Sequence, residues 1–296
     1  VYYLEASQRM EVAANYIVKY LERTIDTFPN IKEMPPFYRE LVPELIDADA
    51  AKKALGHMQA VSKIVRALRS KYIIKVKMLG RGKEGQPKAI SREFIGRLSS
   101  VVKSLNKSIA AYNKAVEKMR EMPTIKTDMS TIIIAGHPNV GKSTLLGKIT
   151  ESKPKVASYP FTTTKLELGY FTHHYLKFQM IDTPGLLDRP SAQRNVIERK
   201  GTAALKHLAA VIIFILDPTE NCGFLIGQQA DLLKGIAKEF GEEKVVVYLS
   251  KTDLANAGQI EIAKKAAGKF KLVEGSMEEA RSLLAKLANK AKVPLN

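Results

Sequence analysis

A glycine-rich stretch at residues 136–143 ends in a lysine and a serine. It matches the pattern G-x-x-x-x-G-K-[ST] and consists of Gly136, His137, Pro138, Asn139, Val140, Gly141, Lys142 and Ser143. The glycines let backbone N–H groups curl around phosphate groups, and the following helix N-terminus adds partial positive charge. Lys142 is then expected to reach the β- and γ-phosphates, and the Ser143 hydroxyl to bind Mg²⁺. The sequence therefore predicts a binding site for a nucleoside triphosphate.

Two further stretches could complete this site. Asp182-Thr183-Pro184-Gly185 ends an apolar run and has the form D-x-x-G. Such a stretch supplies a carboxylate near the metal and a glycine N–H for the γ-phosphate, although the same residues also suit an ordinary turn. The threonines at 162–164 lie between the two motifs, in YPFTTTK. One of them could complete the Mg²⁺ shell, but a threonine run also often begins a strand.

A third stretch concerns the base of the nucleotide. Ser250-Lys251-Thr252-Asp253 follows the apolar run VVVYL, where a GTPase carries N-K-x-D. Asp253 could accept hydrogen bonds from N1–H and N2–H₂ of guanine, which adenine cannot supply, while Lys251 would lie across the base plane. A P-loop kinase or ATPase is therefore a disfavoured alternative. Because the Ser250 hydroxyl is shorter than an asparagine amide, we expect reduced affinity for GTP.

The elements that must position these motifs alternate along the second part of the chain. Short β-branched runs predict strands, and amphipathic segments between them predict helices. The strands are expected at 131–136, 166–171, 175–182, 211–217 and 245–250, and the helices at about 143–151, 193–208, 224–239 and 258–268. This alternation predicts an α/β domain over 126–296, with a mostly parallel sheet and helices on both faces.

The first part of the chain predicts an all-α bundle over 1–125. Apolar residues recur at three- and four-residue steps over 3–27, 61–79 and 94–119, which predicts one helix in each range. Pro35-Pro36 interrupts the helical pattern. Lysines on the side opposite the apolar stripe of the third helix form a candidate basic face, made of Lys103, Lys107, Lys114 and Lys118.

Positive charge is concentrated in this first part. The chain has a formal net charge of +17, and residues 52–126 hold 19 Lys/Arg against 4 Asp/Glu. A polyanion partner would explain this concentration, because lysine and arginine neutralise phosphates and release counterions. A solvated, solubilising helix face is the alternative. A lipid surface is disfavoured because no aromatic-rich apolar face accompanies the basic segment.

Length and composition exclude several classes of protein. The 296 residues suit two domains, and 45% hydrophobic with 26% charged residues is typical of globular chains. The longest apolar runs, at 131–136 and 209–216, are far shorter than the ~20 residues that span a bilayer. A single cysteine, Cys222, excludes an internal disulfide framework and a zinc–thiolate cage. No basic-then-apolar leader follows Val1, so we expect no secretory signal.

Together these residues resemble a G domain of the Obg-like class of P-loop GTPases and, more closely, the nucleolar GTP-binding protein 1 family. The similar stretches are GHPNVGKSTLL, YPFTTTK, DTPGLLDRPSAQRNVIE, and DPTENCG at 217–223 followed by Gln228-Gln229. General GTPases lack the last block. The preceding basic helices also resemble this family's N-terminal bundle. The likeness covers roughly residues 50–253 and, without the long C-terminal extension of eukaryotic members, suggests a short archaeal-type form.

The resemblance implies a set of site residues for GTP or GDP and Mg²⁺. Nucleotide contacts are implied for residues 136–143 and Thr144, for Asp182 and Gly185, and for Ser250, Lys251 and Asp253. Metal contacts are implied for Ser143, Thr163 and Asp182. The residues implied in hydrolysis are Lys142, Thr163, Gly185 and Asn139.

Two residues bear on the rate of hydrolysis. Leu186 stands where many GTPases place the glutamine that orients the attacking water, so we expect slow intrinsic hydrolysis. In potassium-dependent G proteins an asparagine at the position of Asn139 holds K⁺ beside the phosphates, where the ion would stabilise transition-state charge. A role in capping the loop is the alternative for Asn139.

The resemblance implies a GTP-hydrolysing switch that acts in assembly of the large ribosomal subunit. Its partner would be rRNA or a ribosomal precursor, contacted through residues 52–126, and no membrane is expected to take part. We expect a cytoplasmic monomer, or a nucleolar protein in a eukaryotic source. A second hypothesis is an RNA-binding scaffold whose G domain binds nucleotide with negligible hydrolysis.

Overall fold

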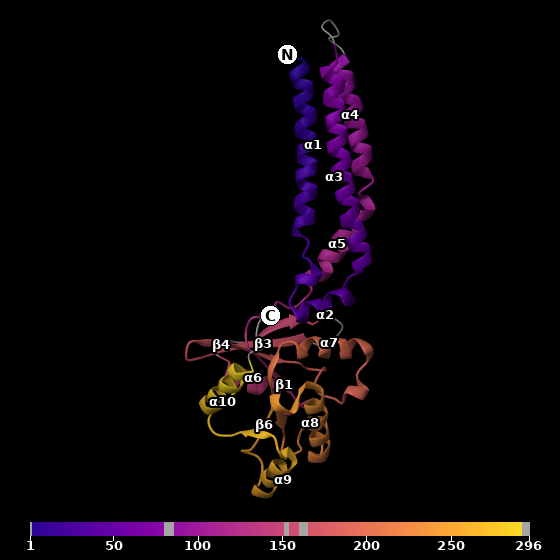
Figure 1. The fold of residues 1–296 in the computed structure, drawn as a ribbon. Coiled ribbons are helices and arrows are strands. Elements are labelled where there is room, and N and C mark those ends of the chain that lie inside the picture. Colours follow the sequence, from indigo (N-terminus) through magenta and orange to yellow (C-terminus); the bar gives the residue numbers. More distant parts are fainter. Residues whose placement is uncertain (1, 80–85, 151–153, 160–164, 292–296) are drawn as a thin grey trace. The chain divides into compact units, whose positions relative to one another are not determined.

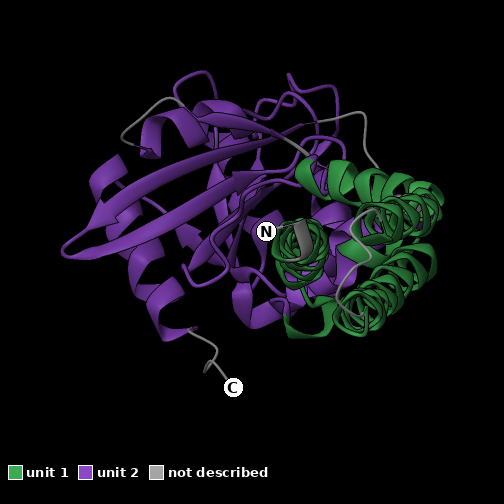
Figure 2. Cartoon of the chain, turned by 90° about the horizontal axis from the view of Figure 1, so that it is seen from above, with its two compact units in different colours: residues 1–33, 42–120 green, residues 34–41, 121–296 purple. Residues whose placement is uncertain are grey.

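The computed structural model describes residues 2–79, 86–150, 154–159 and 165–291. The chain forms two compact units, shown in different colours in Figure 2. The first unit contains residues 1–33 and 42–120, and the second contains residues 34–41 and 121–296. The short segment 34–41 therefore packs with the second unit. Its Tyr38 hydroxyl lies 3.0 Å from the carbonyl oxygens of both Pro123 and Ile125.

The first unit is all-helical, as predicted (Figure 1). Its helices are α1 (Tyr2–Thr27), α3 (Ala48–Lys77), α4 (Gln86–Lys103) and α5 (Asn106–Arg120). A further helix, α2 (Pro36–Leu45), was not predicted; it begins at a proline, which suits the first turn of a helix. The core of the unit comes from the apolar stripes of its helices and includes Met10, Met58, Val65, Tyr72, Phe94 and Leu98.

The prediction of one helix over 94–119 is wrong, because the helix is interrupted between α4 and α5. The Ser104 hydroxyl donates to the Val101 carbonyl at 2.6 Å, and the Leu105 N–H donates to Val102 at 3.0 Å. A serine that bonds to the nearby backbone competes with the helical ladder. Leu105 is nevertheless buried, so the apolar periodicity continues across the break and hides it. Lys103 consequently lies on a different helix from the other three lysines of the predicted basic face.

The second unit contains a seven-stranded sheet in the order β2-β3-β4-β1-β5-β6-β7. The strands are β1 (Thr131–Ala135), β2 (Lys155–Ser158), β3 (Lys165–His173), β4 (Leu176–Asp182), β5 (Ala209–Leu216), β6 (Val245–Leu249) and β7 (Lys271–Val273). All neighbours from β4 to β7 pair in parallel, while β2 and β3 add an antiparallel edge. The predicted mostly parallel sheet is confirmed, and β2 and β7 are additions to the five expected strands.

Helices cover both faces of this sheet, as predicted. They are α6 (Lys142–Ile149), α7 (Val196–Lys206), α8 (Ile226–Phe240), α9 (Ala257–Ala267) and α10 (Met277–Lys290). Successive residues of β1 point to opposite faces, so Ile133 joins the core under α7, α8 and α9, while Ile132 and Ile134 join the core under α6 and α10. Helix α10 was not predicted.

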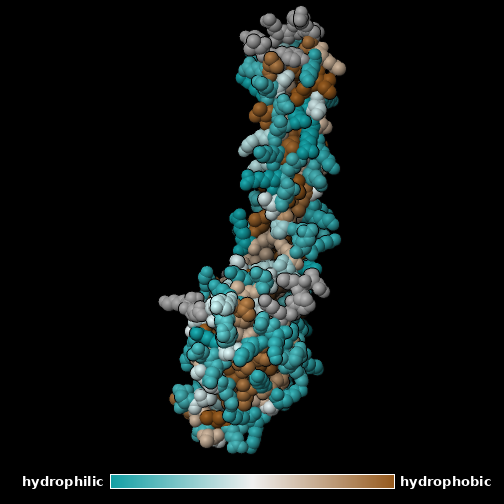
Figure 3. Space-filling model, turned by 60° about the vertical axis from the view of Figure 1, so that its left-hand side comes forward, coloured by the Kyte–Doolittle hydropathy of each residue, from teal (hydrophilic) through white to brown (hydrophobic). Residues whose placement is uncertain are grey.

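Figure 3 shows both hydrophilic and hydrophobic side chains on the surface. Among the described residues, every helix is too short or too polar to cross a lipid bilayer.

Candidate functional site

The predicted motifs converge at one edge of the sheet. Because β4, β1, β5 and β6 run in parallel, their carboxyl ends lie at the same edge. Asp182 ends β4, Gly136 follows β1, Asp217 follows β5 and Ser250 follows β6. Ligands of open α/β sheets bind outside this edge. The order of the strands therefore brings together motifs that are far apart in the sequence.

The loop between β1 and α6 has a backbone shape that depends on glycine. Gly136 has a φ of 140°, and a Cβ placed on it would lie 2.9 Å from the Ile215 carbonyl oxygen. Gly141 has a φ of 99° and caps the N-terminus of α6 without a side chain. Asn139, exposed at the loop, has a φ of 61°. The loop thus curls tightly at the start of α6, which suits the binding of an anion by backbone N–H groups.

Lys142 lies across this loop. Its ammonium group donates to the carbonyl oxygens of Gly136 and His137 at 2.9 Å and 2.8 Å, and its side chain is largely buried. Burial lowers the pKa of the lysine, and the nearby carboxylates of Asp182 and Asp188 oppose that shift. The chain thus holds a cation at the mouth of the loop, on contacts that an incoming phosphate could replace.

Ser143 and Asp182 form a candidate Mg²⁺ site. The Ser143 hydroxyl donates to Asp182 Oδ2 at 2.7 Å, although the two residues come from α6 and β4. Asp182 is fully buried, which raises the pKa of its carboxyl group, and its Oδ1 has no hydrogen-bond partner in the described part of the chain. A buried carboxylate oxygen without a partner is costly, and a hydrated cation would satisfy it.

These two residues fit Mg²⁺ better than a metal held by protein alone. No group of three or more His, Cys, Asp or Glu side chains that could hold a metal occurs among the described residues. Mg²⁺ usually keeps several waters and takes one or two protein ligands plus phosphate oxygens. A serine and an aspartate beside a phosphate loop match that requirement.

The DTPG stretch lies beside the phosphate loop and is held in place by the two buried leucines that follow it. Leu186 and Leu187 are fully buried in the sheet core, and the Gly136 N–H donates to the Leu187 carbonyl at 3.2 Å. Gly185 has a φ of 77°, and its N–H donates to the Asp188 carboxylate at 2.8 Å. Asp188 was not among the predicted site residues. Thr163 lies outside the described residues.

At the other end of the site, Ser250 and Lys251 contact the β5 end rather than solvent. The Ser250 hydroxyl donates to the Leu216 carbonyl at 3.2 Å. The Lys251 ammonium group lies 2.7 Å from Asp217 Oδ2, and Lys251 has a φ of 51°. Asp253 is exposed on the same loop. Lys251 is thus held by a buried carboxylate, while Asp253 remains accessible to a base.

Asp217 and Gln229 organise the β5–α8 loop and were not identified as site residues. Asp217 accepts from the Thr219 N–H at 3.0 Å and from the Cys222 N–H at 3.0 Å. Burial acts to raise the pKa of its carboxyl group, but the hydrogen bonds from Lys251 and Thr219 outweigh burial and lower that pKa. The buried Gln229 side chain bonds both backbone groups of Asp217 and the Phe224 carbonyl. The DPTENCG block and Gln228-Gln229 were the available signal, but only as a likeness to a family.

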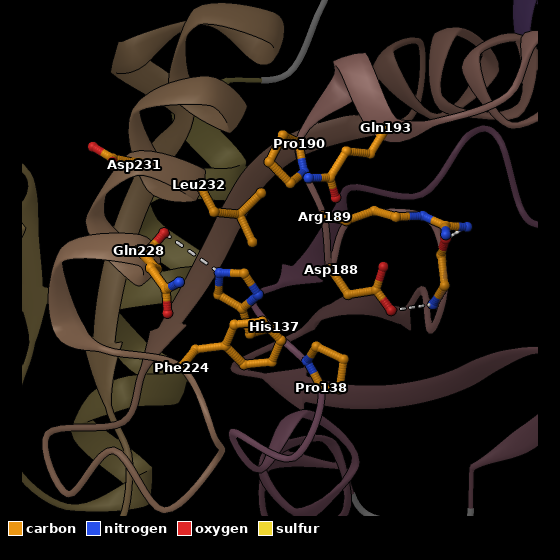
Figure 4. Close-up of a pocket in the computed structure, with 11 residues that line it drawn as sticks. His137, Pro138, Asp188, Arg189, Pro190, Gln193, Phe224, Gln228, Asp231 and Leu232 are labelled. Atoms are coloured by element: carbon orange, nitrogen blue, oxygen red, sulfur yellow. Dashed lines mark hydrogen bonds between the residues drawn. The ribbon is translucent and has the colours of Figure 1, made fainter.

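His137 points away from the phosphate loop. Its ring stacks on Phe224 with centroids 3.9 Å apart, and burial lowers its pKa, which favours the neutral imidazole. The pair borders a cavity of about 610 Å³ between the DTPG loop and α8, drawn in Figure 4. Pro138 also lines this cavity, whereas Val140 is buried in the core and Thr144 is exposed on α6.

The fold and the site define a class of protein. A parallel sheet carries a G-x-x-x-x-G-K-S loop after β1, a D-x-x-G stretch after β4 and an S-K-T-D stretch after β6, all at one edge. This is the arrangement of a P-loop GTPase domain.

Comparison with known families agrees with this assignment and extends it. Residues 4–126 match the sequence model of the NOG1 N-terminal helical domain, and residues 131–251 match that of the 50S ribosome-binding GTPase family. The chain belongs to the nucleolar GTP-binding protein 1 family.

The sequences of several relatives align with most of this chain. An uncharacterized protein of Methanocaldococcus jannaschii is 38% identical over 85% of this chain and 70% of its own length. Nucleolar GTP-binding protein 1 of Arabidopsis thaliana is 37% identical over 79% of this chain and 35% of its own length. That of Encephalitozoon cuniculi is 33% identical over 93% and 52%. The chain thus spans about a third to a half of these two named relatives.

A solved structure of a putative nucleolar GTP-binding protein 1 from Plasmodium falciparum is 32% identical to this chain. The match covers 57% of this chain and 91% of that one, with a TM-score of 0.49.

Proposed function

We propose that this chain binds GTP and GDP with Mg²⁺ at the edge of the sheet. The observation that carries the proposal is the meeting of Lys142, Ser143 and Asp182, with one buried carboxylate oxygen left without a partner in the described part of the chain. The loop backbone at 136–143 and the start of α6 at Thr144 would hold the phosphates. Ser143 and Asp182 would hold the metal, and it would neutralise phosphate charge when bound.

We extend the proposal to the remaining predicted residues of the site. The Gly185 N–H would bind the γ-phosphate, and Thr163 would complete the metal shell. Lys251 and Asp253 would hold guanine, and Ser250 would line the loop between base and phosphates. Support comes from the buried Asp217 carboxylate, which fixes the Lys251 ammonium group, and from the exposure of Asp253.

We propose that the chain hydrolyses GTP to GDP and phosphate slowly by itself. Leu186 is fully buried and apolar, so it cannot orient a water molecule for attack. Asn139 is exposed on the phosphate loop, where its side chain could hold K⁺ beside the phosphates. The buried Leu186 also leaves open the second candidate, a nucleotide-binding scaffold with negligible hydrolysis.

We propose that this switch acts on precursors of the large ribosomal subunit. One matched family is described as a 50S ribosome-binding GTPase, and the named relatives are nucleolar GTP-binding proteins. Residues 52–126, with 19 Lys/Arg against 4 Asp/Glu, offer a surface for rRNA phosphates. Lys103, Lys107 and Lys114 are exposed on that segment.

Single-turnover hydrolysis of GTP separates the two candidate functions. The chain is mixed in excess with labelled GTP and Mg²⁺, alone and with large-subunit precursor particles. A switch predicts slow release of phosphate from the chain alone and acceleration by the particles. A scaffold predicts that particles bind the chain but leave the rate unchanged, and that result would contradict our proposal of a hydrolysing switch.

A further inference from the structure

The two residues that follow the DTPGLL stretch contact the backbone N–H and the backbone carbonyl of Gly185. Asp188 Oδ2 accepts a hydrogen bond from the Gly185 N–H at 2.8 Å (Figure 4). Arg189 Nη2 lies 3.5 Å from the Gly185 carbonyl oxygen, and the same guanidinium group bonds Glu198 Oε1 at 2.7 Å. The Gly185 N–H, which is proposed to bind the γ-phosphate, is therefore already bonded to a charged acceptor, the Asp188 carboxylate.

Asp188 also acts on the lysine of the phosphate loop. The Asp188 carboxylate is one of the two that oppose the lowering of the Lys142 pKa, the other being the metal-site residue Asp182. Of the two groups that would bind a terminal phosphate, the Gly185 N–H thus contacts the Asp188 carboxylate directly, and the Lys142 ammonium group is under its electrostatic influence. A carboxylate and a phosphate are both anionic acceptors, and they repel each other at short distance.

We propose that the Asp188 carboxylate occupies the place of the γ-phosphate on the Gly185 N–H, so that Asp188 sets the preference of the site between GDP and GTP. This inference rests on the proposed binding of GTP. GDP has no γ-phosphate and leaves the contact between Asp188 and Gly185 in place. GTP must displace the carboxylate to reach the same N–H, which lowers its affinity relative to GDP.

The local structure allows this exchange to occur by movement of one side chain. The backbone on the N-terminal side of Asp188 is fixed, because Leu186 and Leu187 are buried and the Leu187 carbonyl accepts from the Gly136 N–H. The Asp188 side chain, in contrast, is partly exposed and lines the cavity of about 610 Å³ beside α8. That cavity gives a displaced carboxylate room and contact with solvent.

The test compares two nucleotides in matched variants of the full chain. Asp188→Ala removes the competing carboxylate, and Asp188→Asn removes its charge but keeps an acceptor. Asp231→Ala is the control, because Asp231 lines the same cavity but is exposed and lies near Lys234. Dissociation constants are measured for GDP and for a non-hydrolysable GTP analogue, with Mg²⁺.

We expect Asp188→Ala to bind the GTP analogue about tenfold more tightly, because the γ-phosphate no longer has to displace the Asp188 carboxylate from the Gly185 N–H and is no longer repelled by it. GDP binding should stay within about twofold. Asp188→Asn should lie between this variant and the unmodified chain, and Asp231→Ala should match the unmodified chain.

An equal change for both nucleotides, no change, or weaker binding of the analogue in Asp188→Ala would overturn the inference, while leaving the proposed binding of GTP intact. If the unmodified chain binds neither nucleotide, the proposed function fails and the inference fails with it.

Discussion

Ser250 is the residue at which the guanine end of the site departs from the usual N-K-x-D pattern. Its side chain is buried beside the phosphate loop: a Cβ placed on Gly141 would lie 3.9 Å from the Ser250 Cβ. The hydroxyl donates back to the Leu216 carbonyl at 3.2 Å. An asparagine amide has both a donor and an acceptor and reaches farther. The serine therefore leaves the base and phosphate ends of the site without a bridge through this side chain.

We predict that Ser250→Asn strengthens binding of both GTP and GDP, by about five- to tenfold, because one added hydrogen bond contributes about 1 kcal/mol. Displacement of a fluorescent guanine nucleotide measures the change. Ser250→Ala serves as the control and should bind both nucleotides with nearly unchanged affinity. Unchanged or weaker binding by Ser250→Asn, at an unchanged melting temperature, would show that the amide makes no such bridge.

At the scale of elements, the β5–α8 loop connects the base end of the site to the body of the sheet. Gln229, at the start of α8, donates to the Asp217 and Phe224 carbonyls at 3.1 Å and 2.9 Å and accepts from the Asp217 N–H at 2.8 Å. Asp217 in turn holds Lys251. The conformation of a nine-residue turn thus depends on one buried amide.

We predict that Gln229→Ala lowers the free energy of unfolding by about 2–3 kcal/mol, because it leaves the buried Asp217 N–H without its partner and removes one of the hydrogen bonds that the Asp217 and Phe224 carbonyls accept. It should also weaken guanine binding, since Asp217 would no longer be fixed against Lys251. The neighbouring Gln228→Ala is the matched control. Gln228 is exposed and its side-chain oxygen accepts from the Leu225 N–H, so loss of that side chain should cost about 1 kcal/mol or less.

Chemical denaturation of both variants measures these two costs. Equal destabilisation by Gln229→Ala and Gln228→Ala would contradict the role given to the buried amide.

How much of each element could be predicted depends on how local its determinants are. The strand–loop–helix at β1, 136–143 and α6 is contiguous, and β-branched runs identified β1, β3, β4, β5 and β6. The break at Ser104 could not be predicted from periodicity, because Leu105 keeps the apolar stripe in phase. The pair of Lys251 with Asp217 spans 34 positions and exists only because β5 and β6 are neighbours.

At the scale of the whole molecule, the chain combines a basic helical unit with a domain that has the loops of a GTPase. Most of the net charge of +17 comes from residues 52–126. Some of these cations are already paired, for example Lys75 with Glu93 at 2.9 Å. Binding of rRNA would therefore depend on the exposed lysines, and it should weaken as salt rises.

We predict that the triple charge reversal of Lys103, Lys107 and Lys114 to Glu weakens binding to an rRNA fragment. It should also reduce the slope of log affinity against log salt by about 2–3, because each phosphate contact contributes about 0.7–0.9. The matched control reverses three other exposed lysines, Lys238, Lys286 and Lys290, which belong to the second unit. Equal effects of the two triple variants would contradict a specific role for the helical unit.

The binding of guanine nucleotide is the claim on which the rest depends, and calorimetric titration of the full chain with GTP, GDP and ATP in Mg²⁺ tests it most directly. We predict that GTP and GDP bind at one site per chain and that ATP gives no saturable heat, because only guanine can donate N1–H and N2–H₂ to Asp253. Asp253→Asn should weaken binding of both guanine nucleotides. Absence of binding by GTP and GDP, or equal binding of ATP, would contradict the account.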